Sequence, residues 1–156
     1  MTVSIQDAKM AYRSAKIIAL LMMNAILLYG MIGYTVSKNQ TAVVFPNPQT
    51  TQLFFYGGFM LSVGLYWGAK QLAQFLLKRQ RWDGHIASES RDLRFLLSIS
   101  IFVCATAEIP AVLGLVFVFL NRNFSVYFPF GILSLTLLAL SFPRKEQWIK
   151  WTHVDF

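Results

Sequence analysis

The segment FLLSISIFVCATAEIPAVLGLVFVFL occupies residues 95–120, and after Asn121-Arg122-Asn123 the chain continues as FSVYFPFGILSLTLLALSF over residues 124–142. Each segment is close to the ~20 apolar residues that an α-helix needs to cross the hydrocarbon core of a bilayer. A connection this short makes the second helix run back antiparallel to the first. The stretch therefore predicts a transmembrane helical hairpin.

Two further apolar runs precede this hairpin, at about residues 17–36 and 53–77, and a polar block at residues 78–94 separates them from it. Both runs are again long enough to span a bilayer as helices. The sequence thus predicts an all-α integral membrane protein. We expect residues 1–156 to form a single transmembrane domain, a four-helix bundle built from two antiparallel hairpins.

The composition supports this fold class and excludes several others. Of the 156 residues, 56% are hydrophobic and 13% are charged, whereas an average soluble domain carries about 25% charged residues. So few charges cannot cover a soluble globule, and so many apolar residues do not suit a disordered chain or a nucleic-acid-binding module. The single cysteine, Cys104, lies inside an apolar run, which excludes an intrachain disulfide scaffold.

The basic residues predict the orientation in the membrane. Three Lys or Arg precede the first run, five lie in the block 78–94 and three follow the last run, whereas the two other loops carry one each, Lys38 and Arg122. By the positive-inside rule, both termini and the block 78–94 are expected in the cytoplasm. No organelle signal is visible, so we expect a multi-pass protein of a prokaryotic plasma (inner) membrane.

Glu108 is the acidic residue that lies inside an apolar run. At ~1.5 Å per residue it lies ~20 Å from Phe95, close to the centre of the bilayer. A carboxylate at that depth costs at least a few kcal/mol, so such a residue commonly faces protein or water and has a function. A carboxyl that exchanges a proton there is a simple reversible proton carrier.

Pro110 follows Glu108 in the same run. Proline has no N–H and crowds the carbonyl four residues earlier, so we expect a bend and a Thr106 C=O without its helical partner. Glu108 and Thr106 could together bind a proton or cation. Alternatively, Glu108 stays protonated and bonds that same oxygen, which would only hold helices together.

Small residues recur at helical spacing on two of the expected spans, and small faces allow two membrane helices to approach closely. The residues are Gly57, Gly64 and Gly68 on one span and Ala107, Ala111 and Gly114 on the other. Depth from the cytoplasmic ends matches best for Gly64 and Ala107. We therefore expect these two spans to pack closely through that pair.

The stretch TAEIPAVLGLV at residues 106–116 resembles the second helix of the c subunit, or proteolipid, of rotary ATP synthases and vacuolar-type ATPases. That family often has Ala-Glu followed by Gly-Leu at six and seven residues after the Glu, the positions of Gly114 and Leu115 here. Its first helix is glycine-rich and its connecting loop is cytoplasmic, as expected here for the helices on either side of block 78–94. The resemblance implies that Glu108 binds a translocated proton or sodium ion.

Two functions thus remain open. The chain could be a small proteolipid-like subunit that handles protons or cations through Glu108, or a structural or accessory subunit in which Glu108 is neutral and serves helix packing. Either function implies other membrane-protein chains as partners, besides the bilayer, and no nucleic acid. His85 and His153 lack neighbours at ligand spacing, and no catalytic motif is visible, so we expect no metal, cofactor or enzymatic activity.

Lys70 is the basic residue inside an expected span. It lies ~10 Å from the cytoplasmic end of residues 53–77, which is shallow enough for its ammonium group to reach the interface by snorkelling. We therefore expect no direct ion pair between Lys70 and Glu108, which lies ~10 Å deeper.

Overall fold

A computed structural model describes residues 5–39, 48–82 and 89–152, and within these ranges the regular structure is entirely helical. The helices are α1 (Ile5–Asn39), α2 (Pro48–Trp82), α3 (Glu89–Asn121), the 3-10 helix η1 (Phe124–Val126), α4 (Tyr127–Ser141) and α5 (Lys145–Thr152). The expectation of an all-α chain is confirmed. The first three helices extend beyond the expected spans, because the polar residues next to the apolar runs continue the helices.

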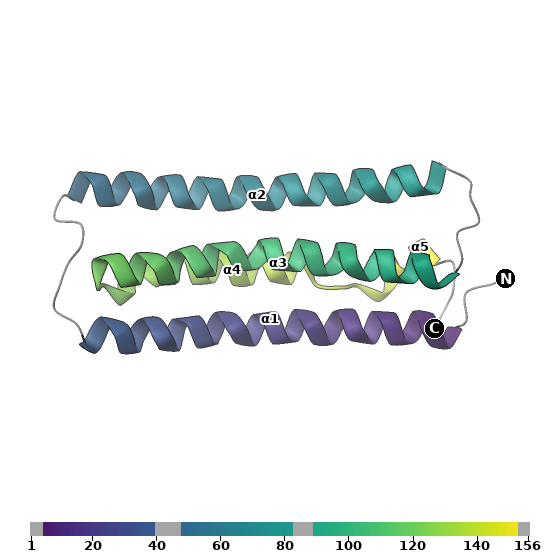
Figure 1. The fold of residues 1–156 in the computed structure, drawn as a ribbon, viewed down its shortest axis with the longest axis horizontal. Coiled ribbons are helices and arrows are strands. Elements are labelled where there is room, and N and C mark those ends of the chain that lie inside the picture. The colour runs from purple at the N-terminus through teal and green to yellow at the C-terminus, as the bar shows by residue number, and fades with distance from the viewer. Residues whose placement is uncertain (1–4, 40–47, 83–88, 153–156) are drawn as a thin grey trace.

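The four long helices run alternately up and down along one axis (Figure 1). The start of α1, the end of α2, the start of α3 and the short α5 all lie at the same end of the bundle. We call this the basic end, because it carries Lys9, Arg13, Lys78, Arg79, Arg94 and Arg144. The opposite end carries Lys38 and Arg122. This segregation of charge is what the positive-inside rule requires of a multi-span protein.

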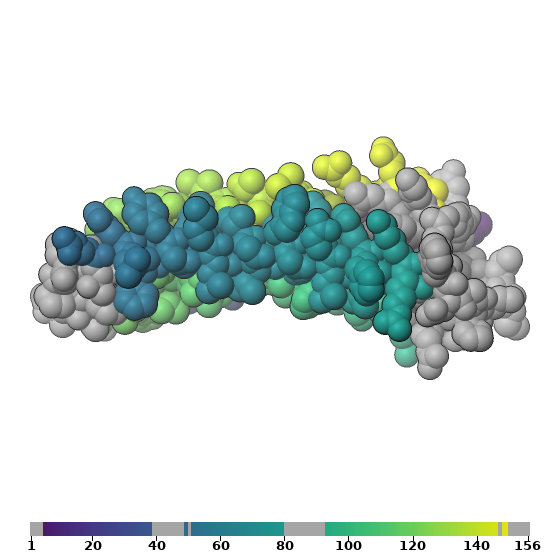
Figure 2. Space-filling view, turned by 90° about the horizontal axis from the view of Figure 1, so that it is seen from above, coloured from purple at the N-terminus to yellow at the C-terminus, as the bar shows by residue number. Residues whose placement is uncertain are grey.

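Helices α3 and α4 form the centre, with α1 on one side and α2 on the other (Figure 1). Figure 2 shows α2 covering one long face, with parts of α3 and α4 emerging beside it. Among the described residues, α1 packs mainly against α3 and α4 rather than against α2. The first expected hairpin is therefore open, with the second hairpin inserted between its arms.

The outer surface of the bundle is strongly apolar. Large side chains such as Leu21, Met31, Leu53 and Met60 are between 62% and 74% exposed, which would be unfavourable in water and suits contact with lipid tails. Three described segments are long and apolar enough to cross a membrane, namely Ile5–Lys38, Leu93–Asn121 and Phe124–Ser141. The chain is thus consistent with a small protein embedded in a membrane.

Helix α2 is as long as α1, but it does not reach the hydropathy of these three segments. Within residues 53–77, its apolar residues are interspersed with several glycines, with Gln71 and Gln74, and with Lys70. The expectation that residues 53–77 form a fourth span therefore rests on the length and position of α2 in the bundle.

The buried face of α1 explains why it packs against the central pair. Its buried residues include Ala8, Ala15, Ala19, Ile26 and Gly33, which recur at intervals of seven and four residues along one side of the helix. Because most of these side chains are small, the α1 backbone can approach its neighbours closely. Gly33, for example, faces Leu115 and Val118 of α3.

The turn between α3 and α4 forms where the sequence predicts it. Arg122 adopts a left-handed conformation with φ 57°, and its N–H donates to the Val118 carbonyl at 2.8 Å. The Asn123 side chain then accepts from the Ser125 N–H at 3.0 Å and caps η1. These local bonds reverse the chain within three residues and place α4 antiparallel to α3.

Candidate functional site: a carboxyl and two phenols inside the bundle

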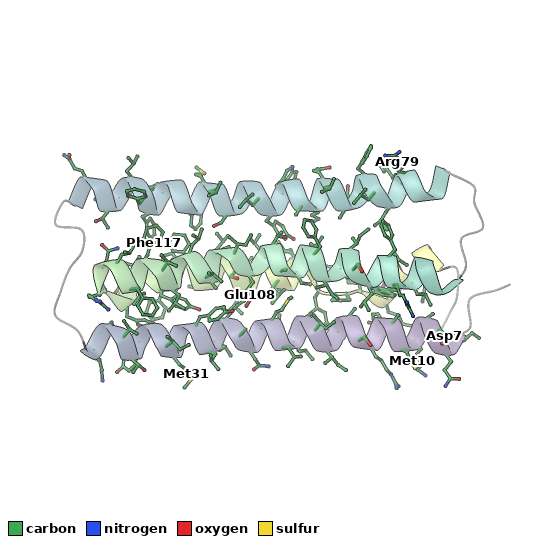
Figure 3. The ribbon with its side chains drawn as sticks, viewed as in Figure 1. Asp7, Met10, Met31, Arg79, Glu108 and Phe117 are labelled. Carbon is green, nitrogen blue, oxygen red and sulfur yellow. The ribbon has the colours of Figure 1, made fainter. Side chains whose placement is uncertain are left out.

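Glu108 projects from the middle of α3 toward α1 (Figure 3). It is half-buried and lies at the edge of the packed face of α3. The Tyr29 phenol of α1 lies close to this side chain. The carboxyl therefore has a neutral hydroxyl group from the neighbouring helix beside it.

Tyr127 brings a second phenol from α4 to the same region. Its hydroxyl donates to the Ile26 carbonyl of α1 at 2.5 Å. Gly30 permits this approach, because a Cβ at that position would lie 3.1 Å from Cε1 of the Tyr127 ring. We refer to Glu108, Tyr29 and Tyr127 as the carboxyl–phenol cluster, which links α1, α3 and α4.

The Thr106 side chain does not point toward the Glu108 carboxyl. Side chains that are two positions apart on an α-helix point about 200° apart. The side chains of Thr106 and Pro110 therefore both lie on the opposite side of α3 from that of Glu108. The Thr106 hydroxyl donates to the Val103 carbonyl of its own helix at 2.8 Å. Pro110 is buried, and α3 continues through it without a break.

The small residues of α3, Ala107, Ala111 and Gly114, are buried, but they contact α4 rather than the expected glycines of α2. The Ala107 carbonyl accepts a hydrogen bond from the Ser134 hydroxyl at 2.5 Å. A Cβ on Gly114 would lie only 2.7 Å from Cβ of Phe130. Ala111 is fully buried in the same core, beside residues such as Leu137 and Leu138. This face of α3 thus belongs to the hairpin of α3 and α4.

The expected contact of Gly64 with Ala107 is wrong. A Cβ added at Gly57, Gly64 or Gly68 would have no atom within 4 Å, so these three glycines point away from the described remainder of the chain. Instead, Gly58 lies against Phe117 and Phe130, at 3.1 and 3.8 Å from the position of a Cβ. Helix α2 presents its other side to the bundle because the buried positions there, from Ser62 to Ala73, form a second stripe that fits α3 and α4.

No protein family, curated protein or solved structure matches this chain. Inferences about function therefore rest on the residues of the chain itself. In the centre of the bundle, these residues are those of the carboxyl–phenol cluster.

Sequence reasoning singled out Glu108 but missed both phenols. The depth of Tyr29 in its span could have indicated its proximity to Glu108. At ~1.5 Å per residue, Tyr29 lies about 18 Å from Ile17, the start of its span, and Glu108 lies about 20 Å from Phe95, the start of its own. Because both spans start from the basic end, the two side chains are at nearly the same level. Tyr127 gives no comparable signal, because its position depends on the close approach of α4 to Gly30.

Proposed function

We propose that this chain is a small membrane subunit in which Glu108 takes up and releases a proton, within an oligomer or a larger complex. The observation that carries the proposal is the placement of the Tyr29 phenol beside the Glu108 carboxyl near the middle of the bundle. A phenol hydroxyl can donate to a carboxylate and can accept from a carboxylic acid. Tyr29 is therefore suited to both protonation states of Glu108.

The surroundings of Glu108 favour a proton over a metal cation. Metal cations with oxygen ligands need several oxygens converging on one point. The Glu108 carboxyl has the Tyr29 hydroxyl beside it, whereas the Thr106 side chain points to the other side of α3 and bonds its own helix. The resemblance to the proteolipid family leaves the proton and the sodium ion open, and this ligand count supports the proton.

The position of Glu108 at the edge of the packed face supports a role for a partner chain. Val112, one turn further along α3, is 42% exposed, and Phe119 on the same side is 41% exposed. A second membrane protein could therefore reach the seam between α1 and α3 and exchange a proton with the carboxyl there. Under this proposal the chain catalyses no reaction itself.

One observation favours a second candidate, an accessory subunit in which Glu108 stays neutral. The carboxyl–phenol cluster brings three helices together, and the bond from Tyr127 to the Ile26 carbonyl joins α4 to α1, as hydrogen bonds between membrane helices commonly do. Gly57, Gly64 and Gly68 also leave one side of α2 open for another helix. Both features suit a protein whose task is to assemble with others.

The two candidates differ in whether Glu108 titrates. A hydrophobic carbodiimide, which attacks protonated carboxyls inside membranes, should label Glu108 in vesicles, and the labelling should fall as pH rises. Glu108→Gln should abolish labelling while the protein still inserts. Tyr29→Phe removes the hydroxyl group beside the carboxyl and should therefore change the pH dependence of the labelling.

Tyr34→Phe is the matched control, because Tyr34 is also on α1 but packs edge-on against Phe124, with the ring centroids 5.5 Å apart. It should leave the labelling curve unchanged. Labelling that is independent of pH, together with a fully active complex containing Glu108→Gln, would refute the proton-binding function and support the accessory subunit.

A further inference from the structure

A cavity of about 160 Å³ lies between α2, α3, α4 and α5, on the side of the bundle toward its basic end. Polar groups line much of it, including those of Tyr66, Lys70, Gln74, Ser100 and Ser141, and Trp148 of α5 also contributes to its wall. The volume equals about five waters at ~30 Å³ each. It is smaller than the roughly 300 Å³ or more of a pocket for a drug-sized ligand. The space therefore suits one small polar group.

One wall of the cavity is fixed by hydroxyl groups. The Ser141 hydroxyl donates to the Leu137 carbonyl of its own helix at 2.8 Å. Its oxygen therefore accepts from the Tyr66 hydroxyl, also at 2.8 Å, which joins α2 to α4. Because both hydrogens are already engaged, this wall contributes rigidity, and the donors that remain for a ligand include those of Lys70 and Gln74.

Lys70 brings a positive charge to the cavity. Its Nζ lies 6.0 Å from the centroid of the Tyr66 ring, and no carboxylate of the described residues forms an ion pair with it. Gln74 and Lys78 follow at intervals of four residues, on the same side of α2. These three residues form a polar stripe that leads from the basic end into the cavity.

The other walls suit a lipid. Leu77 and Leu140 line the cavity, and Leu140 is 57% exposed at the outer surface of the bundle, where acyl chains would lie. Basic pockets between membrane helices at the cytoplasmic level are a recognised way to hold anionic head groups. We propose that this cavity binds the phosphate of an anionic phospholipid, with Lys70 as its counter-charge and Gln74 as a hydrogen-bond donor.

The test is lipid retention by the full-length protein, purified in detergent and measured by native mass spectrometry after exposure to phosphatidylglycerol or phosphatidylcholine. Wild type should retain phosphatidylglycerol preferentially, and Lys70→Gln should weaken that retention about fivefold, the effect expected of one lysine at a membrane surface. Lys16→Gln is the matched control, because Lys16 also lies over a tyrosine, 5.0 Å from the Tyr12 ring, but does not line the cavity. It should retain lipid as wild type does.

A second variant keeps the charge and fills the space. Leu140→Trp adds bulk at the exposed rim of the cavity and should also reduce retention, without disturbing the buried core. Added inorganic phosphate distinguishes free phosphate from a lipid head group as the ligand. If phosphate displaces the lipid, free phosphate also binds in the cavity. If it does not, the ligand is the lipid head group. Equal losses in the Lys70 and Lys16 variants, or equal retention of both lipids by wild type, would overturn the proposal.

Discussion

Gly114 lies where α3 packs tightly against Phe130 of α4, and Gly114→Ala probes this contact directly. The added methyl carbon would lie 2.7 Å from Cβ of Phe130, 3.3 Å from its Cγ and 3.3 Å from Cδ2 of Tyr127. Non-bonded carbons are most stable at about 3.5–4.0 Å. Phe130 cannot relieve the clash by rotating, because its Cβ is fixed to the α4 backbone.

The helices must therefore separate by roughly 1 Å if the methyl group is to fit. That movement would stretch the hydrogen bond from Ser134 to the Ala107 carbonyl. It would also disturb the stacking of Phe117 on Phe130, whose ring centroids are 5.4 Å apart. Overpacking of a well-packed core costs about 1–3 kcal/mol. We expect Gly114→Ala to lower the free energy of unfolding by that amount.

Gly64→Ala is the control, because no atom of the described chain lies within 4 Å of the added Cβ. Its free energy of unfolding should not fall, and the higher helix propensity of alanine should raise it by up to about 1 kcal/mol. The assay is reversible unfolding of the monomer in mixed micelles, followed by circular dichroism. A Gly114→Ala protein as stable as wild type, or a Gly64→Ala protein equally destabilised, would refute the packing of α2, α3 and α4 described above.

Three further predictions use the same helices. Ser134→Ala removes a buried hydrogen bond between α4 and α3 and should cost about 0.6 kcal/mol, the average for such bonds in membrane proteins; no loss in the micelle assay would contradict it. Tyr127→Phe removes the bond from α4 to the α1 backbone and should cost about 0.5–1.5 kcal/mol in that assay, and a more stable variant would contradict it. Cysteines introduced at Ser88 and Ser125, in a Cys104→Ala background, should react with impermeant reagents from opposite sides of the membrane, and labelling from one side would overturn the topology.

The sequence predicts the α3–α4 hairpin well because local chemistry determines it. Two apolar runs separated by three residues can only fold back on each other. Asn123 has a side chain suited to capping, and Arg122 takes the left-handed conformation that ends α3. None of these features depends on a distant part of the chain.

The packing of α2 was not predictable in the same way. Helical periodicity shows that Gly57, Gly64 and Gly68 share a side, but it does not show which neighbour that side meets. The stripe that packs contains Gly58 and the buried residues Ser62, Tyr66, Ala69 and Ala73. Both stripes are at helical spacing, and only the shape of the central hairpin, with Phe117 and Phe130 projecting toward α2, decides between them.

The lipid environment explains why apolar residues do not determine which side of a helix packs against its neighbours. Lipid tails are as apolar as leucine, so burying a leucine against another helix gains little over leaving it in lipid. Hydrophobicity therefore predicts that α1, α3 and α4 enter a membrane and says little about how they pack. Small residues such as Gly30 and Gly114 allow close approach, and polar side chains such as Glu108 and Tyr127 need partners. These few residues determine the arrangement, because each must be satisfied by a particular neighbour, and for Glu108 that neighbour is the phenol of Tyr29 at the same depth on α1.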